Sequence, residues 1–160
     1  DLDSFKSIND GFGHETGDQV IVAVAALLAA AAPKTAIVSR MGGEEFAAVL
    51  PGADPLQAIG AAEAVRQDFA KSATFIDGLP VGATVSVGVA WDQSVTGDLN
   101  ALFRRADAAL YVAKRSGRNR VEMLGPDEVS PLADVEAALR AATQAALPDY
   151  ERSLPAKLRA

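Results

Sequence analysis

The sequence has no cysteine and a single histidine, His14, among its 160 residues. Without cysteine there can be no disulfide, no zinc–thiolate site and no cysteine nucleophile, and one histidine excludes a metal site built from several. Long apolar runs are also missing. The longest, Val20–Ala32, has thirteen residues, whereas a membrane-spanning helix needs about 20. The sequence therefore predicts no membrane contact from this segment.

Basic residues are outnumbered, because 15 lysines and arginines face 21 acidic residues and give a net charge of −6. Sequence-independent binding to nucleic acid depends on a basic face, so no nucleic-acid partner is expected. The length and the 49% hydrophobic content are typical of a single globular domain with one core.

The pattern of apolar and turn residues predicts an α+β fold, with a mostly antiparallel sheet and helices packed on it. Residues 1–15 are polar and glycine-containing, which favours a loop with at most one helical turn. Thr16 and Gln19 have capping-box spacing and predict the start of the first helix. The expected helices are 17–32, 55–72 with Asp54 as its cap, and a third that is capped by Asp98 or Thr96 and ends at about 116. The expected strands are 36–41, 45–50, 81–91 and 121–124.

Two further features concern turns and the end of the chain. Gly42-Gly43 separates two apolar runs and predicts the turn of a β-hairpin. After Gly125-Pro126 the sequence becomes alanine-rich, and residues 126–160 are predicted to form a helical extension.

Carboxylates in two polar clusters are candidate metal ligands. Asp1 and Asp3 stand in the first cluster, and Glu44 and Glu45 stand beside the Gly-Gly pair. Hard oxygen ligands of this kind suit Mg²⁺. Taken singly, each of them is explained more simply as a solvated turn residue.

Other polar residues are compatible with a nucleotide. Lys114 and Arg118 are four apart, so at a helix end they would face the same way and could hold a triphosphate; alternatively they only offset the helix dipole. Asn9 and Asp18 could hydrogen-bond a purine edge, because an amide and a carboxylate match the N1, N2 and O6 atoms of guanine. Their alternative roles are local turns and caps.

Together these clusters resemble the GGDEF family, the diguanylate cyclases. The name-giving motif has the form Gly42-Gly43-Glu44-Glu45-Phe46. The segments DLDSFKSINDGFGHETGD (1–18), ATVSVGVA (83–90) and ADAALYVAKRSGRNRV (106–121) match further family motifs in the family's order. The resemblance covers about residues 1–124. It implies a palm-like sheet of the nucleotidyl-cyclase type, with residues 1–125 as the catalytic domain.

The resemblance also implies an activity. The expected reaction condenses two GTP molecules into cyclic di-GMP with release of two pyrophosphates, in the cytoplasm of a bacterium. One domain would hold one GTP, so turnover would need a homodimer that brings a 3′-hydroxyl to the α-phosphate of the other nucleotide. The implied cofactor is Mg²⁺, with Mn²⁺ as an alternative.

The family's catalytic roles transfer to matching positions. Asp1, the carbonyl of Leu2 and Glu44 would bind the metal. Glu44 would also help to deprotonate the 3′-hydroxyl, and Glu45 would supply a second acidic group. Lys6 would stabilise charge that develops on the phosphates.

The binding roles transfer in the same way. Asn9 and Asp18 would hydrogen-bond guanine. The groups expected near the phosphates are the amides around Ser4 and Phe5, the side chains of Lys114 and Arg118, and the backbone at Gly42 and Gly43.

Two departures from the family pattern bear on regulation and completeness. The inhibitory RxxD site found in many members is replaced by Pro33-Lys34-Thr35-Ala36, so no feedback inhibition is expected through it. Family domains also have a helix and a strand before the first aspartate, which here is residue 1. We therefore expect an N-terminally truncated domain with an unpaired groove in its sheet, and a sensor or dimerisation region upstream in the parent chain.

Two other functions remain as alternatives. A module that binds GTP or a cyclic dinucleotide for regulation, without turnover, is the principal one. A cyclase that makes a cyclic mononucleotide is disfavoured by the GGEEF form of the motif.

Overall fold

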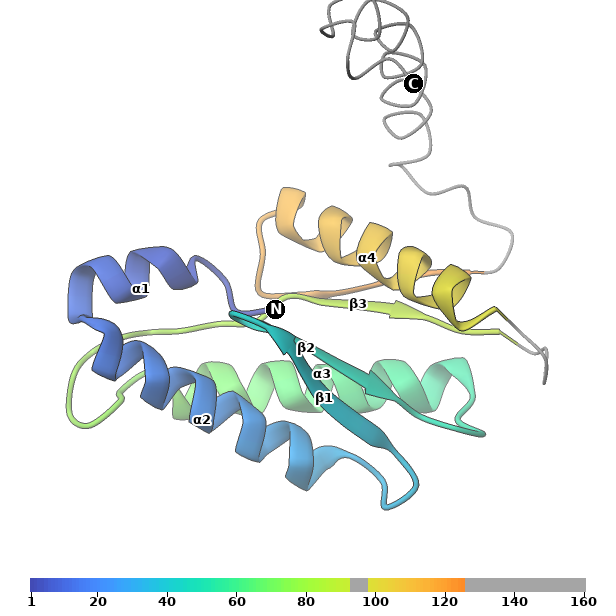
Figure 1. Cartoon of the computed structure of the whole chain (residues 1–160), viewed down its shortest axis with the longest axis horizontal. Helices are drawn as coiled ribbons and strands as arrows, with labels where there is room; N and C mark the ends of the chain where they lie inside the picture. Colours follow the sequence, from blue (N-terminus) through green and yellow to red (C-terminus); the bar gives the residue numbers. More distant parts are fainter. Residues whose placement is uncertain (93–97, 126–160) are drawn as a thin grey trace, which may run out of the picture. The chain divides into compact units, whose positions relative to one another are not determined.

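The computed structural model describes residues 1–92 and 98–125 (Figure 1). Its helices are α1 (Phe5–Phe12), α2 (His14–Ala31), α3 (Pro55–Ser72) and α4 (Leu99–Arg115), and its strands are β1 (Ile37–Gly42), β2 (Glu45–Val49), β3 (Val87–Ala90) and β4 (Val121–Leu124). The predicted α+β class is confirmed. No helix within the described ranges is long and apolar enough to span a bilayer. The predicted C-terminal extension, 126–160, lies outside the described residues.

The described strands form two separate pairs. Strands β1 and β2 pair antiparallel, and β3 and β4 pair parallel. The expected mostly antiparallel sheet is therefore corrected in one respect: half of it is parallel. The reason is that α4 connects β3 to β4, and a helical crossover returns the chain in the same direction.

The hairpin turn differs by one residue from the prediction. Gly42 still belongs to β1 and pairs with Glu45, so the turn consists of Gly43 and Glu44. Gly43 has a φ of 50°, a left-handed conformation that glycine adopts without a steric penalty. Glu44 is thus placed at the very tip of the hairpin.

The prediction of a loop over residues 1–15 was wrong, because residues 5–12 form helix α1. Asn9, Asp10 and Gly11 are weak helix formers, and tertiary packing outweighs them. Ile8 is buried, and Phe5 packs against the core.

Helix α2 begins earlier than predicted, at His14. Gly13 is its N-cap, with a φ of 87°, and its carbonyl accepts from Gly17 N. Thr16 therefore lies inside the helix, and its hydroxyl donates back to the Phe12 carbonyl (3.0 Å). The predicted capping role of Thr16 is corrected accordingly.

The other two helices begin as predicted. Asp54 caps α3 in a full capping box with Gln57, and Asp98 caps α4 by accepting from Asn100 N. Each cap satisfies backbone donors that have no partner within the helix.

The long strand predicted over 81–91 is shorter than expected. Only Val87–Ala90 pairs with β4, because β4 itself has four residues. Val85 instead forms an antiparallel bridge with Leu2. The segment before β3 thus pairs with the first residues of the chain instead of with β4.

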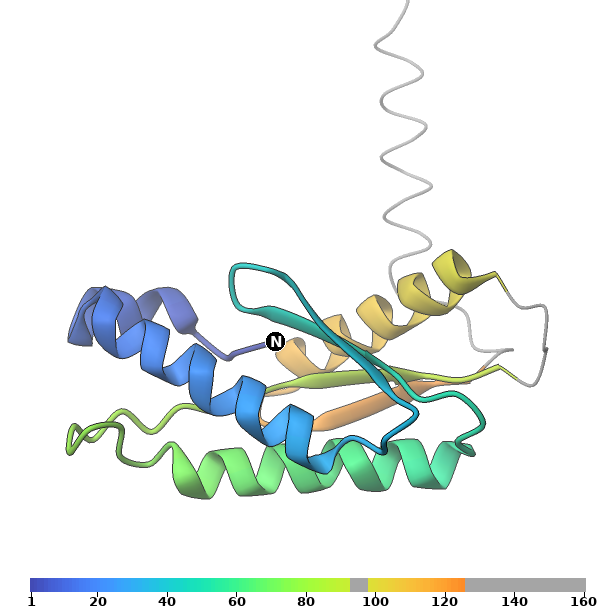
Figure 2. The ribbon, with the colours of Figure 1, turned by 60° about the horizontal axis from the view of Figure 1, so that its bottom comes forward.

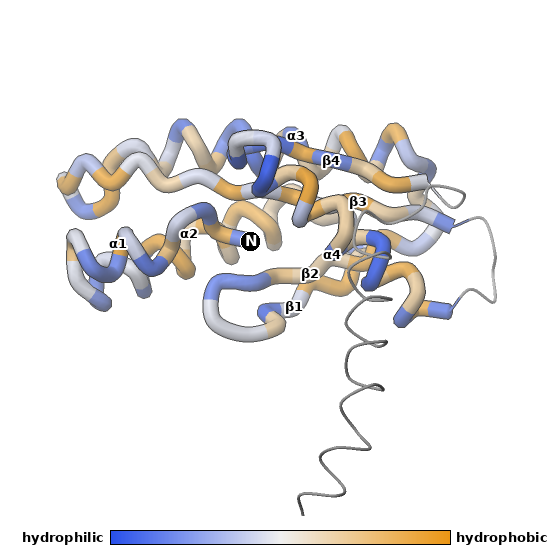
Figure 3. The backbone as a smooth tube through the Cα atoms, turned by 90° about the horizontal axis from the view of Figure 1, so that it is seen from above, coloured by the Kyte–Doolittle hydropathy of each residue, from blue (hydrophilic) through white to orange (hydrophobic). Residues whose placement is uncertain are grey.

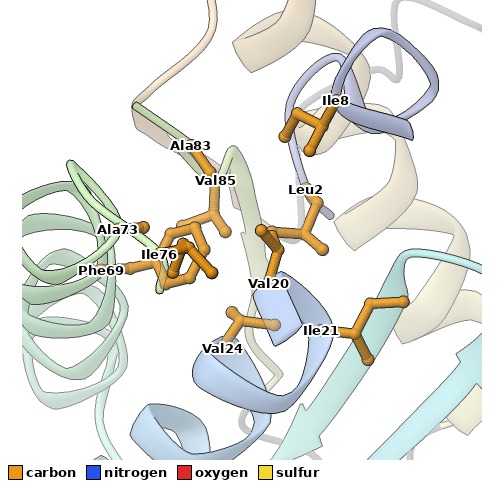
Figure 4. Close-up of a cluster of buried hydrophobic side chains, with 10 residues drawn as sticks. All are labelled: Leu2, Ile8, Val20, Ile21, Val24, Phe69, Ala73, Ile76, Ala83 and Val85. Atoms are coloured by element: carbon orange, nitrogen blue, oxygen red, sulfur yellow. The ribbon is translucent and has the colours of Figure 1, made fainter. Parts of the chain in front are cut away.

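Helices α3 and α4 lie on opposite faces of the β3–β4 pair (Figure 2). Gly88 of β3 makes the close approach of α4 possible, because a Cβ at this position would overlap the backbone of Ala106 and Leu110. The buried side chains of α2, the end of α3 and the segments 2–8 and 73–85 form the core shown in Figure 4. Its ten members are Leu2, Ile8, Val20, Ile21, Val24, Phe69, Ala73, Ile76, Ala83 and Val85.

Candidate active site

The first three residues lie between the hairpin tip and the segment that leads into β3 (Figure 1). Asp3 N donates to the Thr84 carbonyl (2.9 Å), and Ser86 N donates to the Asp1 carbonyl (3.0 Å). Leu2 sits between these two bonds, so its own N–H and carbonyl face the opposite side. There its N–H donates to the Glu44 carbonyl (3.3 Å). The Leu2 carbonyl therefore faces the hairpin, as its expected role as a metal ligand requires.

The side chain of Asp1 is buried and forms an ion pair with a lysine. Its side chain is 5% exposed, and Oδ1 lies 2.8 Å from Lys114 Nζ at the end of α4. This contact is an ion pair without hydrogen-bond geometry, since Oδ1 has no hydrogen-bond donor within the described residues. A buried carboxylate with an open lone pair is suited to a cation.

The groups around Asp1 are suited to a divalent metal ion that takes only a few ligands from the protein and the rest from a bound nucleotide and water. The described residues contain no cluster of three or more metal-type side chains. Mg²⁺ typically uses one or two protein carboxylates and completes its shell with waters and phosphate oxygens. Asp1, the Leu2 carbonyl and Glu44 would make up such a partial set.

The α-amine of Asp1 is also in an unusual environment. It donates to the Ser86 carbonyl (3.1 Å). Burial and the charge of Lys114 lower the pKa of this amine from 8.0 to about 6, against the opposing effect of Asp3, Glu45 and Glu44.

The tip of the hairpin is held by an arginine. Arg40 Nε and Nη2 both donate to the Gly43 carbonyl, at 2.9 and 2.6 Å. This forked contact fixes the turn that carries Glu44. The turn is hydrophilic and lies beside the N-terminus of the chain (Figure 3).

Glu45 begins β2 and is exposed. Burial raises the pKa of Asp107 on α4, and the negative charge of Glu45 adds to this shift. Glu45 is therefore close enough to α4 for its charge to be felt there.

Asp3 joins three parts of the site through its buried carboxylate, which is 6% exposed. Ser86 Oγ donates to Oδ1 (2.7 Å), whereas Thr84 Oγ1 (2.7 Å) and Asn119 N (3.0 Å) both donate to Oδ2. The bond from Asn119 is informative because Asn119 follows Arg118. Asp3 thus ties the turn after α4 to the segment that carries Asp1.

The turn after α4 has a left-handed backbone. Gly117 has a φ of 111°, Arg118 of 62° and Asn119 of 45°. Arg118 N donates to the Ala113 carbonyl (3.0 Å), which is the long bond of a Schellman motif. The expectation that Lys114 and Arg118 share a helix face is therefore corrected: the helix ends at Arg115, and Arg118 belongs to the turn.

Arg118 still reaches the neighbourhood of α1. A cavity of about 310 Å³ is lined by Arg118, Asp3, Thr84 and the α1 residues Ser4 and Ser7, among others. Ser4 precedes α1 with a φ of 54°, and its carbonyl accepts from Ser7 N (2.8 Å). The N–H groups of Phe5 and Lys6 stand in the first turn, where a helix offers them no acceptor. An anion placed here would meet these donors and the positive end of the helix dipole.

The two residues expected to contact guanine lie at the junction of α1 and α2. Asn9 is in the second half of α1 and packs against Gly17 of α2. Asp18 follows Gly17 and is exposed. Lys6 is exposed on the first turn of α1, and Gly42 has open space around it.

Sequence reasoning missed three contributors to the site. They are Asp3, a candidate metal ligand by sequence whose carboxylate instead accepts three protein hydrogen bonds, the side chain of Arg40, and the backbone N–H of Asn119. No local signal identifies Asp3, because its three donors come from residues more than 80 positions away. Arg40 was detectable in principle, since it stands three residues before the glycine that it contacts.

Known proteins share both the sequence and the fold. The family described as "Diguanylate cyclase, GGDEF domain" matches residues 1–120. Diguanylate cyclase DgcM of Escherichia coli K12 is 46% identical over 121 residues, which are 76% of this chain and 28% of that protein. The chain thus spans little more than a quarter of the length of this curated relative.

Two solved structures extend the comparison. The active GGEEF domain of a diguanylate cyclase from Vibrio cholerae aligns with a TM-score of 0.69 at 38% identity, covering 77% of this chain and 78% of that one. The coiled coil and GGDEF domain of DgcB from Caulobacter crescentus, in complex with c-di-GMP, aligns with a TM-score of 0.68 at 36% identity, covering 78% and 66%. With the family match over residues 1–120, these likenesses show that the chain belongs to the GGDEF family of diguanylate cyclases.

Proposed function

We propose that this domain condenses two GTP molecules into cyclic di-GMP and releases two pyrophosphates. The observation that carries the proposal is the buried side chain of Asp1, which lies between the Glu44 turn and Lys114 and whose Oδ1 has no hydrogen-bond donor among the residues that the structure describes. A carboxylate, a second acidic residue and a lysine at one point are the groups that phosphoryl transfer uses for positioning and charge neutralisation.

Members of this family generally use a divalent metal, and we assign Mg²⁺ here, with Mn²⁺ as an alternative, to Asp1, the Leu2 carbonyl and Glu44. When bound, the metal would polarise phosphate oxygens and offset their charge. Lys114 forms an ion pair with Asp1. When the metal binds Asp1, the ammonium of Lys114 would be free to contact the phosphates. Arg118, the Phe5 and Lys6 amides and the Lys6 side chain would hold the same phosphates from the α1 side.

The base would be held at the corner between α1 and α2, where Asn9 and Asp18 lie. The hairpin could pass close to the sugar and phosphates because Gly42 has no side chain and open space around it. Glu44 would take the proton from the 3′-hydroxyl, and Glu45 would supply a further negative charge nearby.

The chemistry calls for two domains. The 3′-oxygen of one GTP forms a bond to the α-phosphorus of the other, the bond to pyrophosphate breaks, and the same exchange in the other direction closes the ring. A single site with one bound GTP cannot align both reactions, so the active unit is a homodimer with two-fold symmetry. The solved structure of DgcB includes a coiled coil together with its GGDEF domain, which supports a sensor or dimerisation region as a further part of the proposal. The use of GTP supports a cytoplasmic location.

The test is chromatographic measurement of cyclic di-GMP formed from GTP and Mg²⁺ at several protein concentrations. We expect product, with a rate that rises faster than linearly with protein concentration. Glu44→Gln should lower the rate by about 100-fold or more, because it removes a metal ligand and a base. Glu15→Gln, on the exposed first turn of α2, is the matched control and should keep the full rate.

Two outcomes would overturn the proposal. GTP binding without any product, in a folded chain, would favour the regulatory binding module. A cyclic mononucleotide as product would identify a different cyclase.

A further inference from the structure

Gly17 in the first part of α2 lies directly against the side chain of Asn9 in α1. A Cβ at position 17 would overlap Asn9 Oδ1, and it would lie 3.0 Å from Asn9 Cγ and 3.3 Å from Phe5 Cζ. Gly17 is buried. The place of a side chain at position 17 is thus taken by the carboxamide of Asn9.

The reason for glycine at this position is steric. Gly13 has a φ of 87°, which explains its glycine by conformation, whereas Gly17 is helical and has no left-handed φ. Around Gly11 and Gly13 a Cβ would meet nothing within 4 Å. Glycine within a helix is less favourable than alanine, so α2 gives up stability at Gly17 to make room for Asn9.

The contact also sets which end of the carboxamide is presented to a ligand. Asn9 Oδ1 is buried and has no hydrogen-bond donor within the described residues. With the oxygen against Gly17, the amide nitrogen of Asn9 is directed away from it. Asn9 therefore offers donors only, and Asp18, the residue after Gly17, offers an acceptor.

We propose that Gly17 is a positioning residue that selects guanine over adenine, by holding Asn9 with its nitrogen outward. The inference rests on the proposed function, in which Asn9 and Asp18 contact the base. Guanine matches a donor beside an acceptor, because it presents the O6 acceptor and the N1 and N2 donors on one edge. Adenine places an amino donor where guanine has O6, so it would set a donor against a donor.

The test compares Gly17→Ala with Gly11→Ala, a control in α1 where the added methyl meets nothing. The readouts are the equilibrium affinities of the full chain for GTP and for ATP, together with thermal unfolding. Gly17→Ala should weaken GTP binding by about tenfold, the value of one lost hydrogen bond with its unpaired partner. ATP binding should stay unchanged, so selectivity should fall. Gly11→Ala should leave both affinities unchanged.

A double-variant cycle separates positioning from packing. In an Asn9→Ala background the methyl of Gly17→Ala no longer meets the carboxamide, so it should cause no further loss of GTP affinity and should raise the melting temperature. If Gly17→Ala alone fails to fold, the comparison of Asn9→Ala with the Asn9→Ala/Gly17→Ala double variant still tests the inference. Equal losses for GTP and ATP, or losses that add fully in the Asn9→Ala background, would overturn the inference.

The two proposals fail differently. If the unsubstituted chain binds no GTP, the proposed function falls and the inference falls with it. If it binds GTP and Gly17→Ala leaves the ratio of GTP to ATP affinity unchanged, only the inference falls.

Discussion

The two strand pairs of this domain differ in how they are supported. The β3–β4 pair is covered by α3 on one face and α4 on the other, and Gly88 allows α4 to touch its backbone (Figure 2). The β1–β2 hairpin is largely open: Ile37 and Met41 are 65% and 61% exposed. Its turn is held by the local contact of Arg40 with Gly43.

The candidate site takes its groups from both regions. Lys114 comes from the last turn of α4 and Arg118 from the turn that follows it, on the covered side, whereas Glu44 comes from the open hairpin. Asp1 lies where the two regions approach each other. The comparison indicates that substitutions on the covered side should act on folding as well as chemistry, and that those in the hairpin should act on chemistry alone.

The largest expected effect is that of Gly88→Ala in β3. The added Cβ would overlap backbone atoms of Ala106 and Leu110, and backbone cannot move aside as a side chain can. We expect the free energy of unfolding to fall by about 3 kcal/mol, at the upper end of overpacking costs. Urea unfolding measures this change.

The hairpin offers the matched control for Gly88→Ala. A Cβ at Gly42 would meet nothing within 4 Å, so Gly42→Ala should change stability by less than about 0.5 kcal/mol. It should nevertheless slow cyclic di-GMP formation, because the methyl enters space assigned to the nucleotide. Equal losses of stability in the two variants would contradict the contrast between the regions.

An intermediate effect is expected at Asp3, which connects the covered side to the first residues. Asp3→Asn replaces one acceptor oxygen by a donor. At Oδ1 the hydroxyl of Ser86 would lose its acceptor, and at Oδ2 both Thr84 Oγ1 and Asn119 N would lose theirs. Stability should fall by about 2 kcal/mol. The KM for GTP should rise, because a neutral amide oxygen accepts more weakly than a carboxylate from Asn119 N, and the turn that carries Arg118 is then held less firmly.

The control for Asp3→Asn is Asp10→Asn, on the exposed part of α1. It should alter neither stability nor KM. If Asp3→Asn lowered stability while KM stayed constant, Asp3 would be a structural residue without influence on the phosphate-binding turn.

The sequence predicted the elements whose signals are local. The predicted cap Asp54 is confirmed, and of the two candidate caps of α4 the structure has Asp98; the apolar runs on either side of Gly42-Gly43 predicted the hairpin. Helix α1 was not predictable in this way. Its residues favour a turn by propensity, and burial of Ile8 and packing of Phe5 against α2 and the core decide the outcome.

The geometry of the site was predictable only in part. The resemblance of the motifs indicated that Asp1, Glu44 and Lys114 belong to one site. The ion pair between Asp1 and Lys114 and the buried bonds of Asp3 depend on how segments more than 80 residues apart meet, and spacing along the chain carries no information about that. The parallel pairing of β3 and β4 could have been predicted from the sequence, because a helix between two strands favours parallel pairing.

The smallest expected effect on stability is that of Arg40→Gln, which removes the forked contact with the Gly43 carbonyl. Arg40 is exposed, so the free energy of unfolding should change by about 0.5 kcal/mol or less. The turnover rate should fall several-fold, and more Mg²⁺ should be needed for half-maximal rate, because Glu44 is the next residue of the turn. Arg104→Gln, which loses the exposed pair with Asp98 at 3.7 Å, should leave the Mg²⁺ dependence unchanged. An unchanged Mg²⁺ dependence for Arg40→Gln as well would mean that the hairpin tip keeps its geometry without Arg40, and that the open region is held by the strand pairing alone.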